Sequence, residues 1–245
     1  MNVATAFQWG ALVASAVFAL IRLPLAVKGR NPMLFWALVL TAVGVAISIP
    51  SIYLPFDALL GGTNYANLIL RFAVYGVMFM IGSISAAAFR APQARRLILG
   101  RPGLVVLAVT AVATTVLFLL CDLPVSSPGL YGYPEQYLLW VYAMVGRIYP
   151  AYICACLVVP AFRAAAHGRR PALLRGGSAL IGISLAEVVL WSALGITRWP
   201  IGVWDYVLPH SAVILLAIGL GCVGLYGMSA GRKEKRSLLT TNPAK

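Results

Sequence analysis

Residues 103–123 read GLVVLAVTAVATTVLFLLCDL, and this stretch decides the fold. The charged side chain within it is Asp122, close to its end. A helix that crosses a hydrocarbon core about 30 Å thick needs roughly 20 apolar residues, each rising about 1.5 Å. The stretch therefore predicts a membrane-spanning helix.

Similar apolar stretches occur along the whole chain and predict a seven-helix membrane bundle. Pro, Gly, Asn or clustered basic residues stand at their edges, and the connections are too short to hold a second domain. We expect an all-α polytopic membrane protein in which residues 1–231 form a seven-transmembrane-helix bundle and residues 232–245 a short basic tail. The other six predicted spans are residues 5–27, 33–54, 66–89, 137–162, 176–197 and 206–230.

Composition excludes the soluble and disordered classes. Hydrophobic residues make up 61% of the 245 residues, whereas charged residues make up 10%. A soluble domain carries about 25% charged residues, and a disordered chain is poor in the large apolar residues that abound here. The lipid bilayer is therefore the expected partner, and we expect a multi-pass protein of a cell membrane.

The basic residues predict the orientation. Short loops rich in Lys and Arg stay on the cytoplasmic side, and every second connection is basic, whereas the opposite ones carry Arg198. The N-terminus is predicted outside and the C-terminus in the cytoplasm. The net charge of +13 then reflects topology and attraction to anionic inner-leaflet lipids, at about 1 kcal/mol per basic residue near the surface. It gives no reason to expect a nucleic acid partner. The basic connections hold Lys28 and Arg30; Arg90, Arg95, Arg96 and Arg101; Arg163, Arg169, Arg170 and Arg175; and Arg232, Lys233, Lys235 and Arg236.

The sequence lacks the residues that common membrane chemistries need. A retinal Schiff base requires a lysine inside the membrane, and no lysine falls within a predicted span. Haem needs facing histidines, but His167 lies in a basic connection and His210 near one end of the last span. HExxH and the phosphate-binding P-loop pattern GxxxxGK[ST] do not occur. We expect no enzyme activity, no catalytic residues, no cofactor and no metal site.

Two opposite charges near the membrane midplane form the principal candidate site. Arg147 lies about 15 Å from the start of its span at Tyr137, and Glu187 about 14 Å from Ser178. Charges at this depth cost about 2.5–3.5 kcal/mol each unless they pair or face water. We expect the two to pair, because their helices are consecutive and antiparallel. The pair either fixes helix packing or forms a ligand-binding or proton-responsive centre.

The remaining polar residues give weaker ligand-binding or ion-coupling candidates. Arg71 and His210 each lie about 6 Å inside their spans. Each candidate has an ordinary packing alternative, and a lone histidine is more often a packing residue than a sensor. The candidates beside Arg147 and Glu187 are Tyr149, close to the helix-weakening Pro150; His210; Arg71; Asp122, at the level of Arg71; and Asp57 and Asn67, which would face the outside.

Residues 57–67 also predict a turn between two helices. Gly61 and Gly62 permit a tight turn with positive φ, and the side-chain oxygen of Asn64 can cap the following helix. The block is thus explained by local structure alone, or it binds a ligand through Asp57 and Asn67.

Four segments carry a resemblance to a known family. They are RNPMLFWAL (30–38), DALLGGTNYANLILR (57–71), VLFLL (116–120) and LLRGGSALIGI (173–183). Over residues 10–230 the chain resembles actinobacterial seven-helix integral membrane proteins that are labelled transporters and have no assigned substrate. The resemblance implies the fold more than an activity, and it implies a bacterial plasma membrane as the location.

These observations favour a transporter for a small solute or ion, with a polar centre near the bilayer midplane. The alternative is a membrane sensor or adaptor that regulates a partner protein. A small-molecule ligand would accompany the first function and a protein partner the second. A membrane-embedded enzyme is the weakest class, because no cluster of His and acidic residues gathers at one depth.

Overall fold

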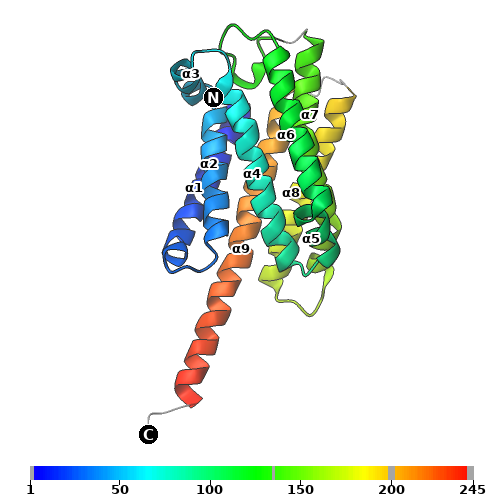
Figure 1. The fold of residues 1–245 in the computed structure, drawn as a ribbon. Helices are drawn as coiled ribbons and strands as arrows, with labels where there is room; N and C mark the ends of the chain where they lie inside the picture. Colours follow the sequence, from blue (N-terminus) through cyan, green and yellow to red (C-terminus); the bar gives the residue numbers. More distant parts are fainter. Residues whose placement is uncertain (1–2, 134–135, 198–201, 242–245) are drawn as a thin grey trace.

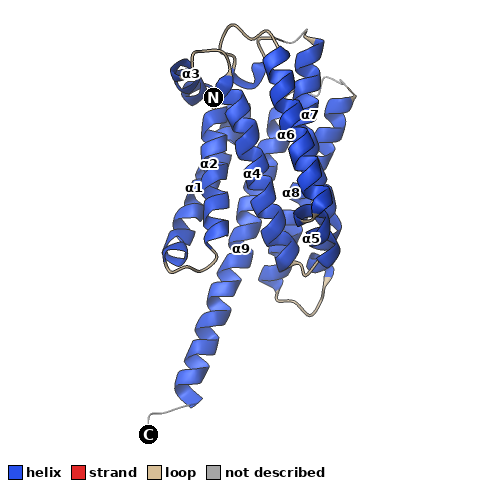
Figure 2. Cartoon of the chain, in the orientation of Figure 1, coloured by secondary structure: helices blue, strands red, loops and turns tan. Residues whose placement is uncertain are grey.

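The computed structural model describes residues 3–133, 136–197 and 202–241, with side chains as far as residue 226. All regular structure in these ranges is helical, and the long helices lie side by side (Figures 1 and 2). Six helices are long and apolar enough to cross a membrane, and a bent pair, α2 and α3, adds a seventh crossing if it counts as one span. The predicted all-α, multi-pass membrane bundle is confirmed. The elements are α1 (Val3–Val27), α2 (Pro32–Ser48), α3 (Pro50–Leu59), α4 (Tyr65–Ala88), α5 (Pro92–Leu99), α6 (Arg101–Leu120), the 3-10 helix η1 (Pro128–Leu130), α7 (Tyr137–Ala166), α8 (Ala172–Ile196) and α9 (Trp204–Thr241).

The second predicted span is not one straight helix. It bends by 90° between α2 and α3. The bend falls at Ile49, which has an extended backbone with φ −80° and ψ 125°. Pro50 follows it, and a proline disfavours the helical conformation in the residue before it while fitting well at the first position of a new helix. The prediction of one continuous helix over residues 33–54 is therefore wrong, although the two helices together still pass as one bent span.

The basic connection after α4 contains a short helix, α5, which the sequence analysis did not expect. Pro92 stands at its start. Ala94 and Ile98, four residues apart, are buried against the bundle, while Arg95 and Arg96 are exposed. Ile98 reaches the backbone of Gly82 in α4, where a Cβ atom would lie 3.1 Å from its Cγ2. The helix thus covers the end of the bundle with its apolar side.

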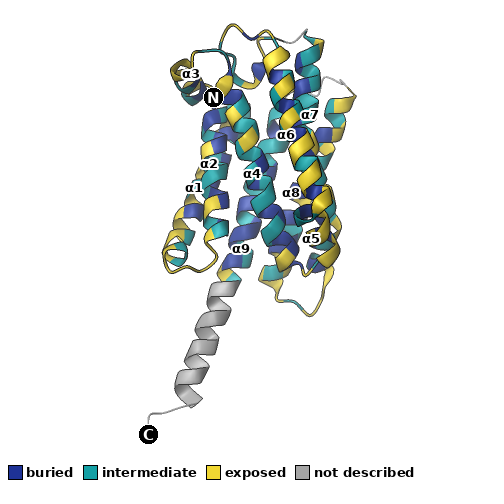
Figure 3. Ribbon diagram, viewed as in Figure 1, coloured by how far each residue is buried: buried dark blue, intermediate teal, exposed yellow. Residues whose placement is uncertain are grey.

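The long helices form a closed ring. The neighbours along it are α1 and α2, α2 and α4, α4 and α7, α7 and α8, α8 and α9, and α9 and α1. The remaining long helix, α6, packs outside the ring against α7 and α4. Its outer side is apolar, as a lipid-facing surface requires, and Figure 3 shows this side exposed along the helix. The exposed side chains there include Val105, Val109, Val112 and Val116.

The bundle has two chemically different ends. One end carries α3 and the connection between α6 and α7; we call it the α3 end. The other, the α5 end, carries α5 and the turn between α1 and α2, and α9 extends beyond it (Figure 1). The basic connections lie at the α5 end, so the charge pattern predicts that this end is cytoplasmic. Residues 232–241 of the predicted tail continue α9 as helix.

Candidate functional site

Arg147 lies on α7 and reaches both neighbouring helices, α8 and α9. Its Nη2 atom donates to Oδ1 of Asp205 at 3.2 Å, and its Nη1 atom donates to the backbone carbonyl of Trp191, also at 3.2 Å. The guanidinium carbon lies 3.6 Å from the centre of the Trp191 ring. Stacking of a guanidinium on an aromatic face is favourable, and more so when both groups are shielded from water. The Arg147 side chain is 11% exposed.

Asp205 joins three parts of the molecule at the start of α9. Its Oδ1 atom accepts from Nε1 of Trp191 at 2.7 Å, in addition to Arg147. Its Oδ2 atom accepts from the hydroxyl of Tyr131, which follows η1, at 3.2 Å. A carboxylate in the first turn of a helix is also favoured by the helix dipole. We call Arg147, Trp191, Asp205 and Tyr131 the Arg147 cluster.

The predicted pairing of Arg147 with Glu187 is wrong. Among the described residues, the only ion pair with a nitrogen–oxygen distance below 4 Å is the one between Arg147 and Asp205. Helical side chains lean toward the start of their own helix. Arg147 therefore leans toward the α3 end, where Asp205 lies, and Glu187, on an antiparallel helix, leans away from that end.

Glu187 instead belongs to the contact between α8 and α9. Its Oε2 atom accepts a hydrogen bond from the hydroxyl of Ser211 at 3.1 Å. One turn earlier on α8, the hydroxyl of Ser184 donates to the backbone carbonyl of Ala212 at 2.7 Å. These bonds join two packed helices through side chains of modest size. They fix the helices relative to each other rather than present a second charged centre to Arg147.

Arg71 lies on the other side of α7. Its guanidinium carbon is 5.2 Å from the centre of the Tyr142 ring, and the hydroxyl of Tyr142 donates to Oδ1 of Asn67 at 2.8 Å. The side chain passes over Gly146, where a Cβ atom would lie 2.6 Å from its Nη1. No carboxylate of the described residues comes within 4 Å of Arg71. Arg71 thus meets α7 at Gly146, beside Arg147. Of the two arginines, Arg147 has an acidic partner within 4 Å among the described residues and Arg71 does not.

The expectation that Asp57 faces the outside is wrong. It is fully buried and accepts from the backbone N–H groups of Asn64 at 2.8 Å and Ala66 at 2.9 Å, and from the hydroxyl of Ser126. Its carboxylate therefore caps α4, although it lies on α3. Asn67 is 4% exposed and is also buried, which corrects the expectation for both residues.

Asn64 does not cap α4 through its side chain. Its Oδ1 atom accepts from the hydroxyl of Tyr53 at 3.0 Å and from the N–H of Ser127 at 2.7 Å, and its Nδ2 donates to the carbonyl of Val125 at 2.8 Å. The predicted positive φ of Gly61 and Gly62 is confirmed at 100° and 72°. Asp57 and Asn64 together fasten the turn before α4 to the connection after α6. We call these two residues and their partners the Asp57 clamp.

The other predicted site residues lie apart from the Arg147 cluster. Tyr149 is fully buried and contacts Tyr75 edge-on, at 5.8 Å between ring centres. His210 donates a hydrogen bond from Nδ1 to the carbonyl of Tyr206, at 2.7 Å. Asp122 is exposed and lies beyond the end of α6, because the helix stops at Leu120 rather than at residue 123. Arg198, assigned to the opposite connection, lies outside the described residues.

Sequence reasoning missed three residues of importance. Asp205 was not among the predicted site residues, although its place at the start of the last span was a signal. Trp191 stands four residues after Glu187 on the same helix face, which is a detectable spacing. Arg22, inside the first span, was overlooked altogether, although it is a charge in an apolar run.

Comparison with known protein families, curated proteins and solved structures gives no match for this chain. The described residues contain no group of three or more His, Cys, Asp or Glu side chains that could hold a metal ion. The chemistry of the Arg147 cluster is thus that of a shielded cation with one carboxylate partner. Such a group can bind an anion and can exchange one anionic partner for another.

Proposed function

We propose that the protein transports a small anionic solute, which Arg147 binds in competition with Asp205. The observation that carries the proposal is the incomplete set of hydrogen bonds around Arg147. Its Nε atom is buried and has no partner among the described residues. A guanidinium binds carboxylate or phosphate best through two parallel hydrogen bonds, whereas Asp205 makes only one.

Arg71 supports the anionic character of the solute. Arg71 contacts α7 at Gly146, next to Arg147, and it has no carboxylate within 4 Å among the described residues. A guanidinium without a carboxylate partner attracts anions, and a shielded charge acts more strongly than one in water. The resemblance to seven-helix proteins labelled transporters agrees with this function.

The competition couples solute binding to the position of α9. Asp205 holds the first turn of α9 to Trp191 on α8, Arg147 on α7 and Tyr131 beside η1. An anion that takes over Arg147 removes the charged member of this set. A ligand shifts a conformational equilibrium only through different affinities for the two states, and here the difference is the exchange of Asp205 for the solute.

Transport assays in proteoliposomes test the proposal. Purified protein is reconstituted, and currents or uptake are measured on gradients of chloride, acetate and phosphate. We expect flux of at least one anion, its loss in Arg147→Gln, and partial retention in Arg147→Lys. Asp205→Asn should bind the anion more tightly, since it removes the competing charge. Arg163→Gln, an exposed change near the α5 end, should leave the flux unchanged.

Two results contradict the proposal. One is an anion flux that Arg147→Gln leaves intact while the variant elutes as a monodisperse protein. The other is flux of all three anions no greater than in protein-free liposomes.

A second candidate function is regulation of a partner protein at the α5 end. It is favoured by α9, which extends past the other helices as a single helix (Figure 1). Removal of residues 227–245 separates the two functions. A transporter keeps its anion flux without this extension, whereas a regulator loses binding to its partner.

A further inference from the structure

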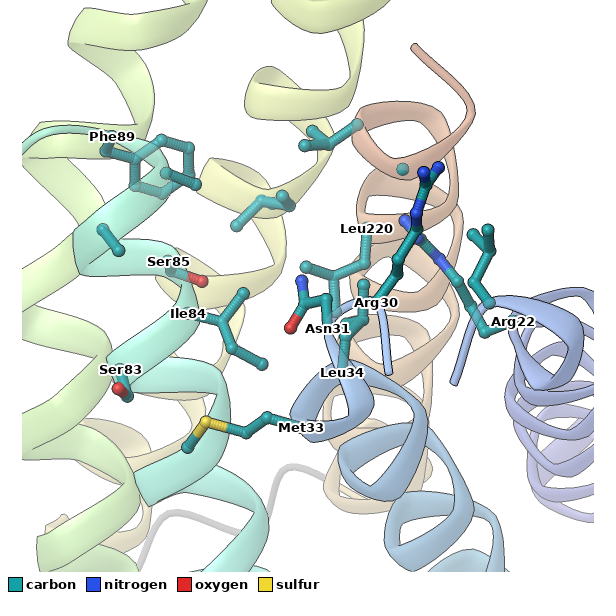
Figure 4. Close-up of a pocket in the computed structure, with 16 residues that line it drawn as sticks. Arg22, Arg30, Asn31, Met33, Leu34, Ser83, Ile84, Ser85, Phe89 and Leu220 are labelled. Carbon is teal, nitrogen blue, oxygen red and sulfur yellow. The ribbon is translucent and has the colours of Figure 1, made fainter. Parts of the chain in front are cut away.

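A cavity of about 590 Å³ opens at the α5 end, far from the Arg147 cluster (Figure 4). It lies between α1, α2, α4, α8 and α9. Aliphatic side chains form most of its wall, among them Leu25, Leu34, Ile84, Ile181 and Leu220. A long apolar wall of this kind suits a hydrocarbon chain.

Two arginines, Arg22 and Arg30, stand together at one side of this cavity, as Figure 4 shows. Neither has a carboxylate within 4 Å among the described residues. Arg22 crosses closely over Gly224 of α9, where a Cβ atom would overlap its guanidinium group. The cavity therefore combines an apolar wall with a positively charged rim.

Ser85 adds a polar group inside the apolar part. It is 2% exposed, lines the cavity from α4, and its hydroxyl has no hydrogen-bond partner among the described residues. Figure 4 places it across the cavity from Asn31. Buried hydroxyl groups nearly always have a partner, and because Ser85 lines the cavity, a molecule bound there would supply one.

We propose that this cavity binds one anionic phospholipid. Its phosphate contacts Arg22 and Arg30, an acyl chain follows the aliphatic wall, and Ser85 donates to an ester oxygen of the glycerol backbone. Charge complementarity selects an anionic lipid over a neutral one. The headgroup of an anionic lipid brings a net negative charge to the two guanidinium groups, whereas that of a neutral lipid does not. The site lies at the opposite end from Arg147 and does not depend on anion transport.

Lipid retention tests the proposal. The protein is reconstituted in mixed phosphatidylglycerol and phosphatidylcholine nanodiscs, released into detergent, and its bound lipids are counted by native mass spectrometry. We expect one phosphatidylglycerol to be retained by the wild type. Retention should fall about fivefold in Arg22→Gln and about fivefold in Arg30→Gln, and by both factors in the double variant. Each factor is the effect of one basic residue near an anionic lipid. Ser85→Ala should lower it about threefold, the effect of one hydrogen bond.

A matched control removes the same charge elsewhere at the α5 end. The double variant Arg163→Gln and Arg169→Gln changes two exposed residues that do not line the cavity. It should retain the lipid as the wild type does. Equal losses of lipid in this control and in the variant with both Arg22→Gln and Arg30→Gln would show general surface attraction and overturn the proposal.

Two further arms identify the bound species. Equal retention of phosphatidylcholine and phosphatidylglycerol overturns recognition of the headgroup charge. Displacement of the lipid by inorganic phosphate alone assigns the arginines to a free anion and overturns the lipid assignment. Lipid that resists phosphate and depends on Arg22 and Arg30 supports it. Anion flux in the same variants is measured separately, so failure of the transport proposal leaves this result interpretable.

Discussion

Asp57 and Asp205 are two acidic residues at the same end of the bundle, with different kinds of partner. Asp57 is fully buried, and two of its three donors are backbone N–H groups. The Asp205 side chain is 25% exposed, and all three of its donors are side chains, one of them charged. Backbone donors move only with the helix that carries them, whereas side chains change rotamers on their own. The Asp57 clamp is therefore a fixed joint, and the Arg147 cluster is the contact that can exchange.

The largest expected effect on stability comes from removal of the Asp57 clamp. Asp57→Ala leaves the N–H groups of Asn64 and Ala66 and the hydroxyl of Ser126 without their acceptor. Each unsatisfied buried donor costs about 1–3 kcal/mol, so we expect destabilisation of about 3 kcal/mol or more. Thermal unfolding of the detergent-solubilised protein measures it. Asp122→Ala, an exposed change at the same end, should stay within about 0.5 kcal/mol. Equal behaviour of the two variants would contradict the joint.

A smaller loss of stability is expected when a side chain added at Gly195 displaces Arg147. At Gly195 a Cβ atom would overlap Nη1 of Arg147 and lie 2.8 Å from Cε of Met144. Gly195→Ala should therefore displace the whole guanidinium of Arg147 from its place between α8 and α9, destabilise the protein by about 1–2 kcal/mol and reduce anion flux, because Arg147 no longer lies where the anion binds. Gly76→Ala is the matched control, since its Cβ atom would meet Leu40 at 3.4 Å. If the two variants unfold and transport alike, Arg147 is not held as the structure indicates.

Two buried tyrosines on α7 give a sharper comparison of satisfied and unsatisfied hydroxyl groups. Tyr142 donates to Asn67, whereas the hydroxyl of Tyr149 has no partner among the described residues. Tyr142→Phe should destabilise the protein by about 1 kcal/mol, and Tyr149→Phe should be neutral or slightly stabilising. Unfolding of both variants in the same detergent decides this. The reverse order would mean that the hydroxyl of Tyr149 has a partner, such as a water molecule.

The smallest expected effect concerns pH. Burial of the hydroxyl end of Tyr131, and then the negative charge of Asp205, raise the pKa of Tyr131 above its ordinary value of 10.0. The folded state therefore holds this proton more firmly than the unfolded chain does. The stabilising contribution is complete below about pH 10 and declines as the pH rises above it.

Replacement of Tyr131 tests this dependence. Tyr131→Phe should flatten the fall in stability between about pH 9 and pH 11 and change stability by less than about 1 kcal/mol at neutral pH. Tyr65→Phe, an exposed tyrosine at the same end, controls for tyrosine ionisation in general. An unchanged pH profile in Tyr131→Phe would remove Tyr131 from the Arg147 cluster.

The fold follows from the sequence because apolar length is a local property. The stretch 103–123 contains α6 almost entirely, and the other spans match helices within a few residues, apart from the bend at Pro50 and the extension of α9 to Thr241. That bend has a local signal as well, since Pro50 and Pro55 both fall within the predicted second span. The helix α5 was readable from Pro92 and the spacing of Ala94 and Ile98.

The site was harder to predict because its contacts join distant parts of the chain. The depth of Arg147 in the bundle followed from counting residues, but its partner depended on the direction in which side chains lean along antiparallel helices. Asp57 accepts from Ser126, 69 positions later in the chain. Nothing local in either segment predicts that contact, because α3 and the connection after α6 meet only after the helices have packed.

The break between α2 and α3 has a consequence for the surrounding bilayer. With 17 residues, α2 is about 25 Å long, which is shorter than an average hydrocarbon core of about 30 Å. A short apolar helix is accommodated by local thinning of the membrane. The lipid shell beside α2 should thus be thinner than that beside α6, and the protein should favour thin membranes over thick, sterol-rich ones.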